Sequence, residues 1–136
     1  MKTVLFVCVH NAGRSQMAEA LTNYRATELG LKLRAWSAGT VGGKDLNPIA
    51  MQAMGEIGVS MAEQTPKLLT QEMADQADRI ISMGCGVGVG ACPARFLLTE
   101  DWNLEDPAGQ PIERVRVIRD QIRLKVDRLL SEWGAV

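Results

Sequence analysis

The sequence has no excess of charge of either sign and no apolar run long enough to cross a bilayer. Its 15 basic and 16 acidic residues give a formal net charge of −1, which provides no general attraction to nucleic acid or to acidic membranes. A membrane-spanning helix needs about 18 apolar residues. The apolar start of the chain is interrupted at Asn11 and Arg14, and no small-residue cleavage pattern follows, so no signal peptide is predicted. We therefore expect a cytoplasmic monomer without a nucleic-acid or membrane partner.

Cysteine and histidine are also scarce. The chain has three cysteines, Cys8, Cys85 and Cys92, and one histidine, His10. An odd number of thiols in a reducing compartment is not expected to form a static disulfide framework. Catalytic or redox roles for the cysteines therefore become the main possibilities, and we predict no metal site.

The chain lacks internal repeats, low-complexity segments and linkers, so residues 1–136 are expected to form one domain. The continuous apolar segment 3–9 is typical of a strand buried on both faces of a parallel sheet. An apolar stripe over residues 112–133, at three- and four-residue steps, predicts a terminal helix that packs on a sheet face. Further strands are expected over residues 31–37, 78–84 and 95–100, and further helices over residues 15–30, 47–58 and 70–77.

This alternation of strands and helices predicts the α/β class, with a doubly wound, parallel, four-stranded sheet covered by helices on both faces. In such folds, ligands bind outside the carboxyl ends of the strands. Cys8 lies at the end of the first predicted strand.

The segment between Cys8 and Arg14 carries the strongest functional signal. Five mostly small residues separate the two, and a predicted helix follows directly. Such a loop can turn its backbone N–H groups inward and, with the positive end of the helix, hold a tetrahedral oxyanion. The Arg14 guanidinium can bind two of the anion's oxygens, and the sulfur of Cys8 would face the central atom. The expected oxyanion-binding residues are Val9, His10, Asn11, Ala12, Gly13, Arg14 and Ser15.

The same surroundings favour ionisation of the Cys8 thiol. An unperturbed cysteine has a pKa of about 8.5, and helix N-termini and nearby cations lower it to about 3.5 to 7.5. We predict that the pKa of Cys8 lies about two units below its ordinary value, which makes the thiolate the majority species at neutral pH. Ser15 is placed to donate a hydrogen bond to the thiolate, and Asn11 tolerates a left-handed backbone.

Plainer interpretations exist for two of these residues. A cysteine at the end of a buried strand is often only a small apolar core group. His10 is interpreted mainly as a hydrogen-bonding residue that braces the loop, and alternatively as a group that tunes Cys8.

The segment CVHNAGRSQMAEAL, residues 8–21, resembles the phosphate-binding loop of the low molecular weight tyrosine phosphatase fold. Within that fold it is most similar to the thioredoxin-coupled arsenate reductases. The resemblance covers nearly the whole chain, and it continues through WSAGT at 36–40, NPIAMQAMGEIGV at 47–59, CGVGVGAC at 85–92 and WNLEDPAG at 102–109.

The resemblance implies a reductase rather than a phosphatase. A cysteine phosphatase needs a thiolate, an arginine, an acid and water, and has no use for two further thiols. The resemblance to such reductases implies that Cys85 attacks Cys8 and that arsenite is expelled. A Cys8–Cys85 disulfide then gives way to a Cys85–Cys92 disulfide, which reduced thioredoxin reduces, and no cofactor is bound.

Glycines favour this relay, because three lie between Cys85 and Cys92 and Gly84 directly precedes the pair. Disulfide exchange requires successive sulfurs to meet at bonding distance, and a glycine-rich backbone rearranges at low steric cost. The alternative is that both cysteines are buried small residues in a loop.

The resemblance also implies that Asp106, before Pro107, protonates the departing oxygen. The plainer alternative is a turn, since Asp-Pro initiates turns readily. Phosphatases of this fold tend to carry an aromatic residue just after Asp-Pro that holds a phenyl ring. This chain has Ala108, which favours a small inorganic substrate.

Some relatives bind a monovalent cation near the loop, through groups that correspond to Asn11, Glu19, Ser37 and Thr65 and an acidic residue two positions later. This sequence has Lys67 at that last position, so its ammonium group can replace the charge of the ion. We therefore predict that Glu19 either braces the loop or pairs with Lys67. The expected loop-bracing residues are Asn11, Ser15, Glu19 and Ser37.

The leading hypothesis from the sequence is an arsenate reductase with Cys8, Arg14, Cys85, Cys92 and Asp106 as its catalytic residues. Two alternatives stay open. One is a low molecular weight protein tyrosine phosphatase, in which the distal cysteines are dispensable. The other is a thiol redox sensor without turnover.

Overall fold

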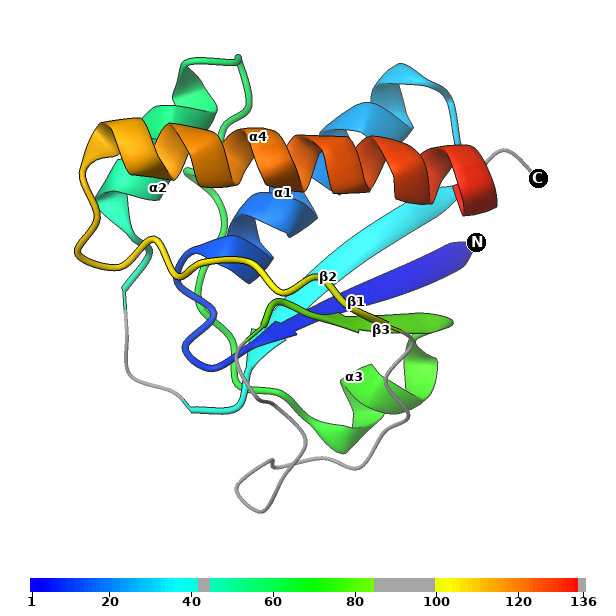
Figure 1. The fold of residues 1–136 in the computed structure, drawn as a ribbon. Helices are drawn as coiled ribbons and strands as arrows, with labels where there is room; N and C mark the ends of the chain where they lie inside the picture. The colour runs from blue at the N-terminus through cyan, green and yellow to red at the C-terminus, as the bar shows by residue number, and fades with distance from the viewer. Residues whose placement is uncertain (42–44, 85–99, 135–136) are drawn as a thin grey trace.

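The computed structural model describes residues 1–41, 45–84 and 100–134, and within them the strands form one parallel four-stranded sheet in the order β2-β1-β3-β4 (Figure 1). This confirms the predicted α/β class. The strands are β1 (Lys2–Cys8), β2 (Leu33–Gly39), β3 (Arg79–Ser82) and β4 (Glu100–Asp101). The helices are α1 (Arg14–Glu28), α2 (Pro48–Gly55), α3 (Gln71–Gln76), α4 (Ile112–Leu129) and the π-helical turn η1 (Leu130–Gly134).

Helices cover both faces of the sheet. Figure 1 shows α1, α2 and α4 on one face and α3 on the other. Alternate residues of the central strand β1 point to opposite faces, so Val4 and Phe6 join the larger apolar core while Leu5 and Val7 join the smaller one. Because both faces are buried, β1 is apolar from Val4 to Cys8, and the predicted central strand is confirmed.

The apolar stripe of α4 is also confirmed. Val115, Ile118, Ile122 and Val126 are fully buried. They belong to the same core as Phe6, and α4 packs on both α1 and α2. None of the helices in the described part of the chain is long and apolar enough to cross a membrane.

Several element boundaries differ from the sequence-based expectation. Helix α1 ends at Glu28 rather than at the expected residue 30; Gly30 follows it at φ 68°, and the Leu31 amide donates back to Ala26 O at 2.8 Å. This helix-ending turn delays the start of β2 to Leu33. The 95–100 strand is described only at Glu100, and residues 95–99 lie outside the described part.

The second and third predicted helices also end or begin a little differently. Asn47 caps α2 as predicted, since its side chain accepts from the amides of Ile49 and Ala50. The helix ends at Gly55, and Gly58, the expected stop, lies in the following turn at φ 78°. Helix α3 spans Gln71–Gln76 instead of the expected 70–77, because the Thr70 side chain caps it.

Glu56 links α2 to α4 through two arginines. Its carboxylate accepts hydrogen bonds from Arg116 at 2.7 Å and from Arg119 at 2.9 Å, and Arg119 also donates to Ala53 O at 2.8 Å. The hydrogen bonds from Arg116, with Arg119 adding to them, lower the pKa of Glu56 from 4.5 to about 2. A carboxyl whose pKa is lower in the folded state stabilises the fold fully above its unfolded pKa, and this stabilisation is lost as the pH falls towards the folded value.

We therefore expect Glu56→Gln to flatten the acid limb of the stability profile. In the wild type the free energy of unfolding should fall between pH 4.5 and about 2 as Glu56 becomes protonated. Urea unfolding at a series of pH values measures the slope. Glu63→Gln, at an exposed position on the loop after α2, is the matched control and should keep the wild-type slope. An acid slope in Glu56→Gln equal to that of the wild type would contradict this account.

Candidate active site

The loop after β1 leads directly into the amino end of α1. Gly13 stands at the N-cap position, and no side chain caps the first amides of the 15-residue helix. Uncapped amides and the helix dipole make such an end attractive to anions. Asn11 adopts the left-handed backbone at φ 56°, as its residue type allows. The loop therefore turns around the space in front of Cys8.

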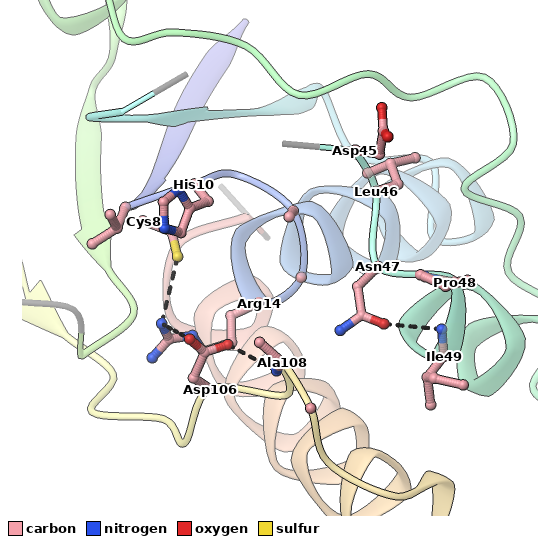
Figure 2. A pocket seen from close by; sticks show the side chains of 14 residues that line it. Cys8, His10, Arg14, Asp45, Leu46, Asn47, Pro48, Ile49, Asp106 and Ala108 are labelled. Carbon is pink, nitrogen blue, oxygen red and sulfur yellow. Dashed lines mark hydrogen bonds and ion pairs between the residues drawn. The ribbon is translucent and has the colours of Figure 1, made fainter. Parts of the chain in front are cut away.

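Arg14 is fixed by main-chain acceptors from two distant segments. Its Nη1 donates to Met83 O at 3.0 Å and to Leu104 O at 2.7 Å, and its Nη2 lies 3.7 Å from Cys8 Sγ (Figure 2). Its buried Nε has no hydrogen-bond partner within the described residues. A cation held this close stabilises a thiolate. The guanidinium is thus held against the sulfur with a donor still available to an oxyanion.

Asp106 stands across the site from the sulfur. Its Oδ2 lies 3.7 Å from Arg14 Nη2, its Oδ1 accepts from the Ala108 amide at 3.0 Å, and its side chain is 59% exposed. Pro107 packs on the oxyanion loop, since a Cβ added at Gly13 would lie 2.7 Å from Pro107 Cγ. Glycine at position 13 therefore allows the Asp-Pro segment to approach the loop closely.

These groups line one cavity of about 580 Å³. Most of the predicted oxyanion-binding residues line it, namely Val9, His10, Ala12, Gly13 and Arg14, together with Cys8 and Asp106. The wall opposite is formed by the segment that leads into α2 (Figure 2). Sequence reasoning missed this wall, whose members are Asp45, Leu46, Asn47, Pro48 and Ile49.

Asn11 and Ser15 do not line the cavity but lie buried behind the loop. Asn11 Nδ2 donates to Ser15 Oγ at 2.8 Å, and Asn11 Oδ1 accepts from the Lys67 amide at 2.8 Å. The structure therefore places both residues as braces, and the oxyanion would meet main-chain groups of the loop rather than these side chains.

Gln16 completes the bracing and was missed by sequence reasoning. It is fully buried, and its Nε2 donates to Asn11 Oδ1 at 2.8 Å and to Thr65 O at 2.9 Å. Gln64 Nε2 in turn donates to Gln16 Oε1 at 2.6 Å. A buried polar group needs such partners, because an unpaired one costs about 1 to 3 kcal/mol. In the sequence, Gln16 is marked only by its place in the first turn of α1, directly before the apolar Met17 and Ala18.

Glu19 lies beside Lys67. Ser37 Oγ donates to Glu19 Oε1 at 2.7 Å, and Lys67 Nζ lies 3.4 Å from the same oxygen. The ammonium group also donates to Thr65 O at 3.1 Å. Of the two interpretations of Glu19, the structure shows the pair with Lys67, and Ser37 adds a brace. Across residues 1–41, 45–84 and 100–134, no group of three or more His, Cys, Asp and Glu side chains has a geometry that could hold a metal ion.

Cys85 and Cys92 lie outside the described residues. Of the five predicted catalytic residues, the structure brings together Cys8, Arg14 and Asp106. It describes the chain up to Gly84, the residue directly before Cys85. His10 lies in the cavity wall, and its Nδ1 has no hydrogen-bond partner in the described part of the protein.

The similarity to known proteins, in sequence and in structure, covers nearly the whole chain. A glutaredoxin arsenate reductase from Synechocystis is 38% identical over 135 residues, which span 97% of this chain and 98% of that protein. The solved structure of an arsenate reductase in the phosphate binding state has a TM-score of 0.80 at 35% identity, over 97% of this chain and 98% of that one. A thioredoxin-dependent arsenate reductase from Corynebacterium glutamicum has a TM-score of 0.75 at 32% identity, over 97% of this chain and 61% of that one.

The family comparison agrees with the geometry. The sequence pattern of the low molecular weight phosphotyrosine protein phosphatases matches residues 3–135, from the second residue of β1 to one residue beyond η1. The fold, the loop from Cys8 to Arg14 and the Asp-Pro segment all lie within this match. The chain belongs to the low molecular weight phosphotyrosine protein phosphatase family.

Proposed function

We propose that this protein reduces arsenate to arsenite, with Cys8 as the nucleophile. The observation that carries the proposal is the position of the Arg14 guanidinium, 3.7 Å from Cys8 Sγ at the uncapped end of α1. This arrangement provides a thiolate and an oxyanion site at one point. The arsenate reductases from Synechocystis and Corynebacterium glutamicum, both similar over nearly all of this chain, support arsenate as the oxyanion.

In the first step the Cys8 thiolate attacks the arsenic atom, and an oxygen departs as water. Arg14 and the loop amides bind the remaining oxygens. Asp106 protonates the departing oxygen, and its exposure and its contact with Arg14 at 3.7 Å place it at the open side of the site. The product of this step is an arsenic(V) thioester on Cys8.

In the second step the Cys85 thiolate attacks Cys8 Sγ. The sulfur–arsenic bond breaks, its electron pair stays on arsenic, and arsenite leaves as two thiols become one disulfide. Cys92 then attacks Cys85, which returns Cys8 to the thiol state and moves the disulfide to the distal pair. Reduced thioredoxin supplies the electrons for the next cycle, and no bound cofactor is needed. We place this chemistry in the cytoplasm, in a single monomeric domain spanning residues 1–136.

Arsenate-dependent consumption of NADPH, in the presence of thioredoxin and its reductase, tests the proposal. The wild type should turn over, and single replacements of Cys8, Cys85 and Cys92 by serine should each lower the rate by about 10³-fold or more, because each thiol is needed in every cycle. Normal turnover in Cys85→Ser and Cys92→Ser would contradict the relay.

Two further assays separate the alternatives. Replacing thioredoxin with glutaredoxin and glutathione tests the electron carrier, since the Synechocystis relative is named for glutaredoxin. Efficient hydrolysis of p-nitrophenyl phosphate, unaffected by loss of Cys85 and Cys92 and without arsenate reduction, would instead identify a phosphatase. Oxidation-dependent partner binding without any turnover would identify a redox sensor.

A further inference from the structure

The ends of β3 and β4 are joined through the side chain of Asp101. Ser82 and Asp101 are partners in the parallel pairing of the two strands, and the Trp102 amide donates to Ser82 O at 2.9 Å. Asp101 Oδ1 then accepts two hydrogen bonds, from Ser82 Oγ at 2.5 Å and from the Gly84 amide at 2.6 Å. One carboxylate oxygen therefore holds both a side chain and the main chain of the segment that leads to Cys85.

Gly84 has a conformation that few other residues adopt. Its φ is 84°, and an added Cβ would lie 2.9 Å from Asn103 Cα and 2.9 Å from Leu104 N. Glycine is the residue type that occupies this region at no steric cost. The bond from the Gly84 amide to Asp101 therefore fixes a sharp turn, tight against the 103–104 backbone, one residue before the first distal thiol.

The same turn is connected to the oxyanion site through Arg14. Arg14 Nη1 donates to Met83 O and to Leu104 O, and the Leu104 amide donates to Met83 O at 3.2 Å. Met83 is thus held from the Arg14 side, and Gly84 is held from the Asp101 side. These contacts set the place and direction in which the chain leaves the described region towards Cys85, relative to the Cys8 sulfur.

We propose that Asp101 is a positioning residue for the attack of Cys85 on Cys8. The inference rests on the proposed reductase function. Asp101 has no part in the first step, the attack of Cys8 on arsenate. It acts in the second, in which the Cys85 sulfur forms a bond to Cys8 Sγ, the sulfur–arsenic bond breaks, and arsenic receives the electron pair. Loss of Asp101 therefore slows the release of arsenite and leaves the reactivity of Cys8 unchanged.

A single-turnover experiment tests the proposal on the reduced full-length protein without an electron carrier. One measurement is the rate of arsenite release after mixing with arsenate. The other is the rate of Cys8 alkylation by iodoacetamide, followed by mass spectrometry of the Cys8 peptide with and without protecting phosphate. Asp101→Ala should slow arsenite release by about 10- to 100-fold, the effect expected when a reacting group is misplaced by about 1 Å.

Asp101→Asn keeps an oxygen acceptor for the Gly84 amide and should recover the rate to within about threefold, since a neutral acceptor retains most of a hydrogen bond's geometry. Glu100→Ala removes an exposed carboxylate from the neighbouring position of β4 and should behave as the wild type. In all three variants the alkylation of Cys8 and its protection by phosphate should match the wild type.

The outcomes separate the two claims. A wild type that releases no arsenite would overturn the proposed function itself. A wild type that releases arsenite, with Asp101→Ala equally fast, would overturn only the role of Asp101. Slower Cys8 alkylation or lost phosphate protection in Asp101→Ala would also overturn it, because Asp101 would then support the whole site. If Asp101→Ala does not fold, Ser82→Ala decides. This variant removes the hydroxyl donor that orients Asp101 Oδ1 towards the Gly84 amide, so arsenite release should be slower, and an unchanged rate would count against the proposal.

Discussion

Replacing Arg14 with lysine is expected to lower kcat/KM for arsenate by about 10³-fold, the upper range for removing one oxyanion-binding donor. Three donors of the guanidinium point in fixed directions, towards Met83 O, Leu104 O and the Cys8 sulfur. An ammonium group is a point charge with a different shape, so it cannot bind these carbonyl oxygens and an oxyanion together. It would also take from the Leu104 carbonyl oxygen the hydrogen bond that Arg14 donates, whereas Met83 O keeps the hydrogen bond from the Leu104 amide.

Steady-state arsenate reduction measures this effect, and thermal unfolding shows whether the variant is folded. Arg34→Lys is the matched control, because Arg34 is exposed near the amino end of β2, beside Thr3 and at the opposite end of the strands from Cys8. Its kinetics should equal those of the wild type. A folded Arg14→Lys variant with activity within tenfold of the wild type would show that the fork-shaped geometry is unimportant.

Gly39→Ala should lower kcat/KM by about 10²-fold, although residue 39 touches no substrate. Gly39 ends β2 beside Cys8, and a Cβ there would lie 2.7 Å from Val9 O, 2.9 Å from His10 C and 3.0 Å from Asn11 N. All three contacts are main-chain atoms of the oxyanion loop, so the loop itself must shift. A misplacement of about 1 Å at a reacting site costs about 10²-fold in rate.

Gly55→Ala is a matched control for this substitution. Gly55 is the last residue of α2, and an added Cβ would meet nothing within 4 Å. Alanine is preferred to glycine in helices by about 0.5 to 1 kcal/mol, so this variant should keep full activity and unfold at the same or a slightly higher temperature. Equal kcat/KM for Gly39→Ala and the wild type would contradict the close approach of the two segments.

Local sequence signals accounted for the central part of the site. The buried strand β1, the small residues before Arg14 and the following helix are consecutive in the chain, so the spacing alone predicted the oxyanion loop. Asn47 and Pro48 likewise predicted the start of α2, because N-capping depends on neighbouring residues. Asp106 was identified through the family resemblance rather than through local physics.

Long-range contacts could not be predicted in the same way. The partners of Arg14, Met83 O and Leu104 O, are main-chain atoms 69 and 90 residues away, and any residue type can supply a carbonyl oxygen. Gln16 and Gln64 are 48 residues apart, and neither carries a pattern that indicates burial. Such contacts depend on the folded arrangement of segments.

Lys67 places a permanently attached positive charge beside Glu19, which an exchangeable ion would not do. Its ammonium group is tethered by its own backbone, so it stays near Glu19 at an effective concentration that dilution or dialysis cannot change. The positive charge that balances Glu19 is therefore part of the polypeptide itself and does not depend on an ion taken up from the solution. A change in the ionic strength around the protein would act on this largely buried pair mainly as weak screening, because the Lys67 and Glu19 side chains are only 35% and 12% exposed.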